Sequence, residues 1–562
     1  MRLRNACAEG KGLALLVAMA AVVCICNARA AYGAFPPDWR ARAAGEQRCA
    51  ICRDVAEHAE GAVGGAAAAL DALEARCGQL SGACEAARLP CGTLAAAART
   101  AGARRACQEL EVCPRATVAA EARAAPKAAP LSPVDVRVAR AHGPKGYAKL
   151  RVSVISGGPD PSLNPPVNDT SGIFTYDAPF AHRWTDYRLQ SGLVDAVEGG
   201  NTFDVGGVKV DVRLAPRGAG VRGVIVADPC FSSEWVICAF GEAFGMLDRL
   251  PALLNAAAAG GSNGGGAAMD YWTILGDNFY DRDGELSQLF FSRLSLQTKA
   301  TPFSTSLGNH DYWVHGFPEA MNTLKDQFGN GAMQFYAMDT LASQHGEDAF
   351  IDTSVSPNGV LKFLDERSRL PAVNNSIFYH VTGNVGLLGF SGAYKWRAIE
   401  GVVAEACGWF AAQSPLPSVV QLQGHWNDAS LGCNKDMSVP AVYNAMMGME
   451  QCAPIADRLI YFEGHTHCNQ VVQTTETTEV GIMVGGLGMM SACGGVHSYR
   501  LGVTVLDTTN ARARVLYYPL SSGGKPNASA AIALEQCWLA SGLGGCEHLA
   551  QIWKDDPLPA LS

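Results

Sequence analysis

The stretch Gly276-Asp277-Asn278-Phe279-Tyr280-Asp281 is the part of the sequence that decides the fold class. It directly follows Tyr271-Trp272-Thr273-Ile274-Leu275, an apolar run of the length expected for a buried strand. In α/β proteins, ligands bind just beyond the carboxyl ends of the strands. An aspartate on a glycine turn at such a strand end is therefore well placed to hold a metal ion.

Three more clusters of ligand-type residues share this arrangement, since each comes directly after an apolar run that predicts a strand. These clusters are Leu307-Gly308-Asn309-His310-Asp311, Gln423-Gly424-His425-Trp426-Asn427 and Glu463-Gly464-His465-Thr466-His467. Four strand ends that bring Asp, Asn and His side chains to one rim predict a hydrolytic site for two metal ions.

The order of the motifs identifies a family. GDNFY, GNHD, GHW and GHTH resemble the motifs of the calcineurin-like metallophosphoesterases, and GDNFY is similar to the motif of their purple acid phosphatase branch. The resemblance covers residues 223–519. It implies an α/β/β/α sandwich, in which two sheets pack face to face with helices outside, and a dinuclear metal centre that hydrolyses phosphate esters. Helical patterns alternate with apolar runs over these residues, which itself indicates an α/β fold.

The resemblance implies that Asp277 bridges the two metals. Two cations a few ångströms apart need a shared anionic ligand to offset their repulsion, and a carboxylate supplies it. Asn309, His425 and His465 match the family residues that complete the ligands of the second metal.

The first metal would be held by Asp228, Tyr280 and His467, which match the remaining ligands of the family. In purple acid phosphatases this tyrosine binds ferric iron as a phenolate; the alternative for Tyr280 is a ring that packs beside the loop. Iron, zinc, manganese and similar ions all remain candidates for the two metals.

The first motif departs from the family. The family has Asp-x-His or Gly-Asp-x-Gly at this place, whereas this chain has Ala227-Asp228-Pro229-Cys230. Cys230 could act as a thiolate ligand, but in an oxidising compartment a local disulfide with Cys238 is favoured.

Two residues of the second motif are expected to act in catalysis. In the family, the histidine that matches His310 faces the substrate, where it stabilises charge on the phosphoryl group or protonates the leaving oxygen. Asp311 would orient the His310 ring. The implied mechanism is in-line attack on phosphorus by a metal-activated water.

Length and charge limit the other classes of function. A chain of 562 residues is too long for one core, so two or three domains are expected. The net charge of −9 disfavours nucleic acid as a partner, because no basic surface is available to replace counterions.

Residues 1–30 are typical of a secretory signal peptide, with basic residues, then an apolar segment, then Ala28-Arg29-Ala30. The alternative is an uncleaved signal anchor. Sequons occur at Asn168, Asn374 and Asn527. These features predict a disulfide-bonded glycoprotein that is secreted or resides in the lysosomal or vacuolar lumen.

Residues 45–114 contain seven cysteines and a helical apolar period. They resemble the saposin B-type domain, a helical unit that binds lipid. The alternative is a stapled helical domain that binds no lipid. Within either domain, the inner disulfide would join Cys77 to one of two further cysteines. The resemblance implies the outer disulfides Cys49–Cys113 and Cys52–Cys107.

Three segments complete the domain layout. Residues 115–146 are rich in Ala and Pro, which predicts a linker. Residues 147–222 contain period-two alternation, which predicts a β-rich extension with a hairpin around Gly206-Gly207. Residues 520–562 are expected to form a short tail in which Cys537 and Cys546 close a loop.

Two classes of function fit the sequence. The first is a metal-dependent phosphoesterase, for which GDNFY favours phosphomonoesters. A phospholipid phosphodiesterase is the alternative within this class, because acid sphingomyelinase also joins a saposin domain to this catalytic fold. The second class is a lipid-binding protein without turnover, whose site has degenerated at Asp228-Pro229-Cys230.

Overall fold

The computed structural model describes only part of the chain. The described residues are 135–143, 148–156, 174–177, 188–205, 208–232, 238, 244–262, 267–281, 285–312, 336, 338–341, 373–430, 433–487, 501–522 and 525–559. All of them belong to one compact unit, which comprises residues 127–232 and 238–562. The predicted signal peptide, the saposin-like domain and its disulfides from Cys49, Cys52, Cys107 and Cys113 lie outside the described residues.

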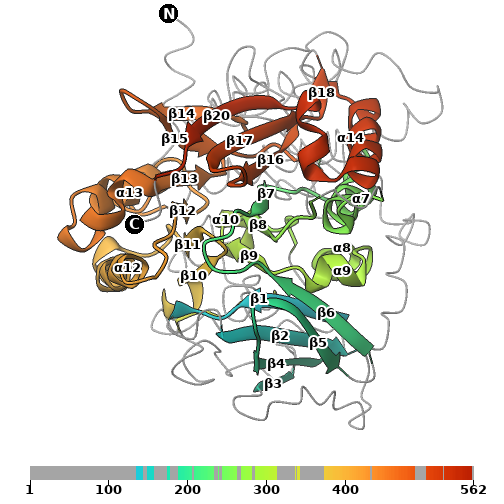
Figure 1. The fold of residues 1–562 in the computed structure, drawn as a ribbon, viewed down its shortest axis with the longest axis horizontal. Coiled ribbons are helices and arrows are strands. Elements are labelled where there is room, and N and C mark those ends of the chain that lie inside the picture. The colour runs from blue at the N-terminus through green and yellow to red at the C-terminus, as the bar shows by residue number, and fades with distance from the viewer. Residues whose placement is uncertain are drawn as a thin grey trace, which may run out of the picture. The chain divides into compact units, whose positions relative to one another are not determined.

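Two six-stranded sheets form the centre of this unit (Figure 1). In spatial order, the first sheet contains β20 (Gln551–Pro557), β17 (Arg512–Pro519), β16 (Gly502–Asp507), β7 (Arg222–Val226), β8 (Tyr271–Leu275) and β9 (Phe303–Ser306). The second contains β10 (Phe378–Thr382), β11 (Val385–Gly389), β12 (Val419–Gln423), β13 (Leu459–Glu463), β15 (Glu479–Met483) and β14 (Gln470–Thr474). The predicted strands before all four motifs are confirmed.

The central strands of each sheet are buried on both faces, and successive side chains of a strand point to opposite faces. In β8, Tyr271 and Leu275 belong to an apolar cluster that also contains residues of the second sheet, such as Leu387 and Phe462. Trp272 and Ile274 belong to the other large cluster, which contains the helix residues. This explains why the strands read as continuous apolar runs rather than as alternating ones.

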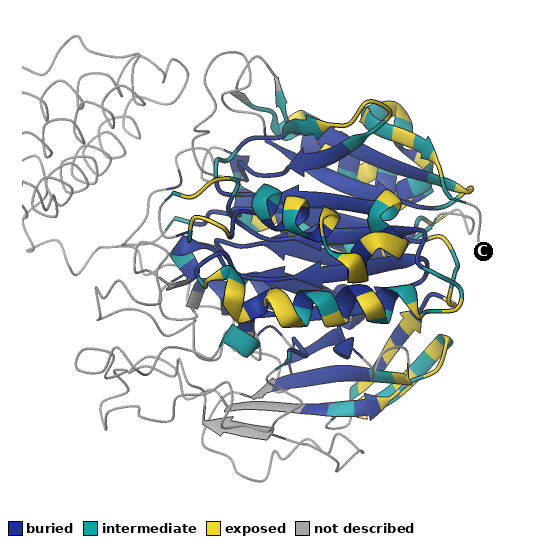
Figure 2. Cartoon of the chain, turned by 90° about the vertical axis from the view of Figure 1, so that its left-hand side faces the viewer, coloured by how far each residue is buried: buried dark blue, intermediate teal, exposed yellow. Residues whose placement is uncertain are grey.

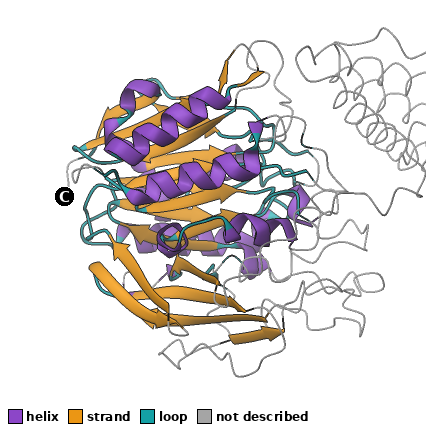
Figure 3. Ribbon diagram, turned by 90° about the vertical axis from the view of Figure 1, so that its right-hand side faces the viewer, coloured by secondary structure: helices purple, strands orange, loops and turns teal. Residues whose placement is uncertain are grey.

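Helices cover the outer faces of both sheets. Figure 2 and Figure 3 show the unit from opposite sides, each with helices in front of strands. α7 (Met246–Ala259) contacts α14 (Ala528–Ser541), and α12 (Trp396–Ala411) contacts α13 (Val439–Met447). This mixed α/β arrangement of two large sheets is compatible with the expected sandwich.

Hydrogen bonds between buried polar side chains join the two sheets below the motif loops. Tyr271 of β8 donates to Gln421 of β12 at 2.8 Å, and Gln421 donates to Gln423 at 2.9 Å. Gln423 then donates back to Thr273 of β8 at 3.0 Å. This inter-sheet hydrogen-bond chain fixes the two strands relative to each other.

The parallel strands set the position of the motifs. β7, β8 and β9 are mutually parallel neighbours, and so are β11, β12, β13 and β15. Their carboxyl ends therefore lie at the same edge of each sheet, where the sequence places the ligand-type residues.

Further strands precede the two large sheets. β1 (Asp135–Arg140), β2 (Lys149–Ser156), β4 (Arg188–Asp195) and β3 (Phe174–Asp177) form a four-stranded sheet in this order. β5 (Gly199–Val205) and β6 (Val208–Leu214) pair as the predicted hairpin. The remaining short elements are the helices α8 (Glu285–Ser292), α9 (Leu296–Ala300) and α10 (Asn309–Tyr312), the strands β18 (Ser521–Ser522) and β19 (Lys525–Pro526), and the 3-10 helices η7 (Val373–Ser376), η8 (Glu450–Arg458), η10 (Leu543–Gly545) and η11 (Glu547–Leu549).

The prediction of a linker over residues 115–146 is wrong where β1 lies, because this strand is buried along its whole length. Its charged residues hid the strand, because two arginines and an aspartate among six residues suggest solvent exposure. Arg137 is instead buried: its guanidinium lies 3.7 Å from the centroid of the Phe291 ring and donates to Gln288 at 3.0 Å. Stacking and hydrogen bonding thus compensate for its removal from water.

The prediction of a short tail over residues 520–562 is also wrong. It contains α14 and β20, and β20 pairs antiparallel with β17 as the edge strand of the first sheet. The predicted loop closure is confirmed, since Cys537 and Cys546 form a disulfide. Among the described residues, no helix is both long enough and apolar enough to span a membrane.

A buried ion pair holds β2 against the segment around Asp339. Arg151 donates to one carboxylate oxygen of Asp339 from two nitrogens, at 3.1 and 2.6 Å. The backbone N–H of His142 donates to the other oxygen at 2.7 Å. The side chains of Arg151 and Asp339 are only 2% and 0% exposed.

We predict that Asp339→Ala lowers the free energy of unfolding by about 3–5 kcal/mol, because it leaves the Arg151 guanidinium buried without its partner. The control is Lys149→Ala, which breaks a pair whose Asp195 side chain is 82% exposed; a loss of at most about 1 kcal/mol is expected. Urea denaturation measures both values. Equal losses in the two variants would contradict the prediction.

Candidate metal centre

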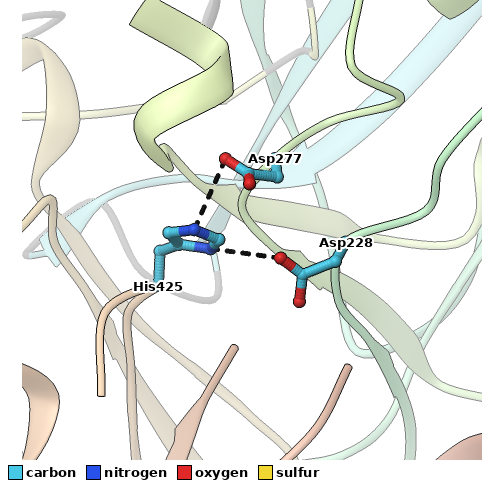
Figure 4. Close-up of side chains that lie close together, drawn as sticks. All are labelled: Asp228, Asp277 and His425. Carbon is cyan, nitrogen blue, oxygen red and sulfur yellow. Dashed lines mark ion pairs between the residues drawn. The ribbon is translucent and has the colours of Figure 1, made fainter. Parts of the chain in front are cut away.

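Three buried side chains from three strand ends meet in the centre of the rim (Figure 4). Asp228 follows β7, Asp277 follows β8 and His425 follows β12. Their ligand atoms lie within 4.8 Å of one another, and all three side chains are at most 1% exposed. Nε2 of His425 lies 3.4 Å from Oδ1 of Asp277, while Nδ1 lies 3.9 Å from Oδ1 of Asp228. These three residues form a group that could hold a metal ion.

The environment of His425 determines which of its nitrogens can bind a metal. Nδ1 lies 2.8 Å from the backbone carbonyl oxygen of Leu275, which can only accept a hydrogen bond. The proton of a neutral ring is therefore assigned to Nδ1, and Nε2 carries the lone pair. This lone pair points toward Asp277.

Three further ligand atoms surround Nε2 of His425. Oδ1 of Asn309 and Nδ1 of His465 each lie 3.2 Å away, and Oδ1 of Asp277 lies 3.4 Å away. A tetrahedral cation with ligands at 2.0–2.1 Å has ligand-to-ligand separations of about 3.3–3.4 Å. Three of the six distances between these four ligand atoms therefore match the spacing that such a cation requires.

The residues expected at the first metal also lie together. The Tyr280 hydroxyl is 2.9 Å from Nε2 of His467, and this nitrogen is 3.7 Å from Oδ1 of Asp228. Oδ1 of Asp228 is buried and has no hydrogen-bond partner, whereas Oδ2 accepts from the backbone N–H of His465 at 3.2 Å. A buried carboxylate oxygen without a partner is unfavourable, and a cation beside it would compensate.

Burial and mutual repulsion of the carboxylates dominate the electrostatics. Burial raises the pKa of Asp228 well above its usual range, and repulsion from Asp277 adds to this although His425 opposes it. Burial also acts to raise the pKa of Asp277, but His425 and His310 outweigh it and lower the value. Burial lowers the pKa of His425, but Asp277 more than reverses this and raises it to about 9. The two carboxylates thus require a positive charge between them, either a proton on His425 or a cation.

Other buried groups at the site respond to the same charges. Burial raises the pKa of Tyr280 well above its usual value, and Asp277 contributes in the same direction. Burial lowers the pKa of His465 to about 3, with His425 adding to the effect. His465 is therefore neutral at physiological pH, as a metal ligand must be.

Asp311 joins the first two motif loops. One carboxylate oxygen accepts from the backbone N–H groups of Gly308 at 2.7 Å and Asp277 at 2.9 Å. The other accepts from the backbone and the side chain of Asn278, both at 3.0 Å. These hydrogen bonds show that Asp311 holds the loop of Asp277; its expected role toward the His310 ring stays a prediction. Burial, followed by repulsion from Asp277, raises its pKa to about 7.

His310 lies at the edge of the group. Its backbone N–H donates to Oδ1 of Asp277 at 2.8 Å, and its ring packs 4.5 Å from the ring of Tyr280, centroid to centroid. It is half-buried, whereas Asp228, Asp277, Tyr280, Asn309, His425 and His465 are buried. Its role toward a substrate stays a prediction.

Cys230 is not a thiolate ligand, because it forms the predicted disulfide with Cys238. Its backbone N–H donates to the carbonyl oxygen of Leu487 at 2.6 Å, and Cys230 forms a parallel bridge with Phe279. The segment that carries Asp228 is therefore fixed beside the loop of Asp277, although its sequence departs from the family motif.

The backbone at the site is strained. A positive φ is unfavourable for residues other than glycine and costs about 1–2 kcal/mol for each of them. Several site residues and one neighbour nevertheless adopt it: Asp228, Asp277, Phe279, Tyr280, His465 and His467, with φ between 52° and 74°. Strain of this kind concentrates at functional sites. Aspartate and histidine adopt this conformation more often than most other residues, but the tendency is too weak to predict it from the sequence.

The motif glycines allow the loops to approach the ligands closely. A Cβ atom on Gly308 would lie 2.3 Å from Oδ1 of Asp277. On Gly276, whose φ is 86°, it would lie 2.7 Å from Nδ1 of His425. Any side chain at these positions would therefore displace a candidate ligand.

Sequence reasoning missed two groups that contact the candidate ligands. One is the backbone carbonyl of Leu275, which no side-chain pattern reveals. The other is Ser430, whose hydroxyl lies 3.3 Å from Nε2 of His465. Serine in a loop carries no signal of this kind.

No protein-family model matches the chain, and no curated protein matches it either. Matching solved structures include the following three.

The first is GAP50, the anchor in the inner membrane complex of Plasmodium, at 11% identity, with 58% of this chain and 98% of that chain covered and a TM-score of 0.30. A Vps29 single mutant from Entamoeba histolytica is 12% identical, with 54% and 94% covered and a TM-score of 0.22. A structure assigned as a 5'-nucleotidase from Staphylococcus aureus is 12% identical, with 57% and 59% covered and a TM-score of 0.27. At these TM-scores the likenesses establish neither a shared fold nor a shared activity.

We predict that Gly308→Ala abolishes tight metal binding, because the new methyl group would displace the Asp277 carboxylate. The matched control is Gly401→Ala in α12, where a Cβ atom meets nothing within 4 Å. It should stabilise the protein by about 0.5–1 kcal/mol, since alanine favours a helix over glycine. Metal analysis after gel filtration, together with denaturation curves, measures both effects. Full metal content in Gly308→Ala would contradict the proposed geometry.

Proposed function

We propose that this chain is a metal-dependent phosphoesterase that hydrolyses phosphate esters at a dinuclear centre, with phosphomonoesters as the favoured substrates. One observation carries the proposal. Asp277, Asn309 and His465 place a ligand atom 3.2–3.4 Å from Nε2 of His425, and the tautomer assigned to His425 leaves a lone pair on that nitrogen. A cation bound here would replace the proton that Asp277 otherwise stabilises on His425.

Asp277 would be shared by the two cations. Its Oδ1 lies 3.4 Å from Nε2 of His425, and its charge also acts on Asp228 and Tyr280. Asp228, Tyr280 and His467 would complete the first site, and Asn309, His425 and His465 the second. A set of oxygen and imidazole ligands suits zinc, iron or manganese. The chemistry that such cations supply is polarisation of a phosphoryl oxygen and activation of a water nucleophile.

The protein groups around the centre would bind and orient the substrate. His310 is half-buried beside Asp277, and its ring would contact a phosphate ester that reaches the rim. It would donate a hydrogen bond to the phosphoryl group or a proton to the leaving oxygen. Asp311 keeps the Asp277 loop in place through its four hydrogen bonds.

We also propose that the protein works in an oxidising compartment, as a secreted or lumenal protein. The disulfides support this location: Cys230–Cys238, Cys407–Cys452 and Cys537–Cys546 are formed among the described residues. Structural disulfides of this kind persist outside the reducing cytosol.

The function is tested by metal content and substrate range together. Purified protein should carry two equivalents of metal and hydrolyse p-nitrophenyl phosphate faster than bis-p-nitrophenyl phosphate. Higher activity on sphingomyelin vesicles than on either soluble ester would replace the phosphomonoesterase proposal with the phospholipid phosphodiesterase. Protein with no metal and no turnover would support the lipid-binding class instead.

We predict that Asp277→Asn removes at least one equivalent of metal and reduces kcat at least 1,000-fold, on the order of the loss of a principal electrostatic group. The amide carries no charge and cannot offset the repulsion between two cations. The matched control is Asp457→Asn, which changes a side chain that is 70% exposed and should leave both values unchanged. Two metals and normal turnover in Asp277→Asn would overturn the assignment.

Tyr280 allows the identity of the first metal to be tested by colour. If it binds ferric iron as a phenolate, the purified protein should show a charge-transfer band in the visible spectrum. We predict that Tyr280→Phe loses this band, because the phenolate oxygen is removed while the ring remains. An active, colourless enzyme free of iron would show that the first metal is a divalent ion such as zinc.

A further inference from the structure

The two nitrogens of His465 have different surroundings. Nδ1 faces the centre, 3.2 Å from Nε2 of His425, and the two rings pack edge to face with centroids 5.0 Å apart. Nε2 points the other way and lies 3.3 Å from the hydroxyl oxygen of Ser430. The side of the ring that faces away from the centre thus has a polar partner of its own.

The direction of this outer hydrogen bond follows from the next group along. The Ser430 hydroxyl donates to Oδ1 of Asp428, because a carboxylate oxygen only accepts. Its single proton is then used, so the hydroxyl can only accept from His465. The proton of a neutral His465 ring is therefore assigned to Nε2, and Nδ1 carries the lone pair.

We propose that Ser430, held by Asp428, is the positioning residue that makes His465 a metal ligand through Nδ1. This inference rests on the proposed function, since it needs a cation at the centre. The chain Asp428–Ser430–His465 selects the tautomer that can bind, fixes the ring and raises its basicity, as carboxylate partners do for other metal-binding histidines.

The backbone around His465 explains why a side-chain partner is needed. Its φ of 74° is strained, so the backbone alone favours other conformations of this residue. Ser430 comes from the loop after β12, the strand end that also carries His425. The loop that supplies His425 to the second metal therefore also holds His465, the other histidine ligand of that metal.

The proposal is tested by metal affinity rather than by turnover. Zn²⁺ is titrated into full-length apoprotein in competition with a chromophoric chelator, and the two binding steps are fitted separately. Ser430→Ala should weaken one of the two steps about 10- to 100-fold and leave the other unchanged. Asp428→Ala should weaken the same step, while Ser430→Thr, which keeps the hydroxyl, should stay close to the wild-type affinity.

The matched control is Asp436→Asn, which removes a negative charge from an exposed position of the same loop region and should change neither step. Unfolding midpoints of the apoproteins show whether each variant is folded. If Ser430→Ala and Asp428→Ala both keep the wild-type affinity for Zn²⁺, while the wild type binds two metals and is active, this inference is overturned and the proposed function stands. Wild-type protein that binds no Zn²⁺ would overturn the proposed function as well.

Discussion

Two carboxylates, Asp228 and Asp277, are buried beside each other where parallel strands end. The surrounding structure offsets the electrostatic cost of this placement. Like charges in a low-dielectric interior repel strongly, so the arrangement is stable only with positive charge close by. The protein provides His425 between the two, and donors from its backbone to single carboxylate oxygens. One oxygen of Asp228 is left for a cation. The chemistry of the site follows from this imbalance of charge.

The same placement accounts for the local backbone. Ligand atoms from several strand ends can approach within a few ångströms only if the loops turn sharply and lie against each other. Gly276 and Gly308 permit the close approach, and Asp311 ties two of the loops together by hydrogen bonds to their backbone. The left-handed conformations of the ligands are the energetic cost of this geometry, and the packed sheets on both sides hold them in place.

The sequence was sufficient to predict the strands before the four motifs and the residues at their ends, because both depend on local pattern. Apolar runs such as that of β8 are strands whatever surrounds them, and the motif glycines mark the turns. What the sequence could not supply depends on tertiary contacts. The burial of Arg137 in β1 requires Phe291, which is distant in the chain, and the partner of His465 is a loop serine. Asp311 accepts three of its four hydrogen bonds from backbone N–H groups, which carry no sequence signal.

The candidate ligands also divide between the two sheets. Asp228, Asp277 and Asn309 follow strands of the first sheet, whereas His425 and His465 follow strands of the second. The inter-sheet hydrogen-bond chain of Tyr271, Gln421 and Gln423 connects the sheets just below them. A cation held by both sets is therefore a cross-link between the two halves of the sandwich. Its binding energy adds to the cohesion of the fold, by about 2.7 kcal/mol when free metal exceeds the dissociation constant 100-fold. Removal of the cation by a chelator would then lower the free energy of unfolding by this amount.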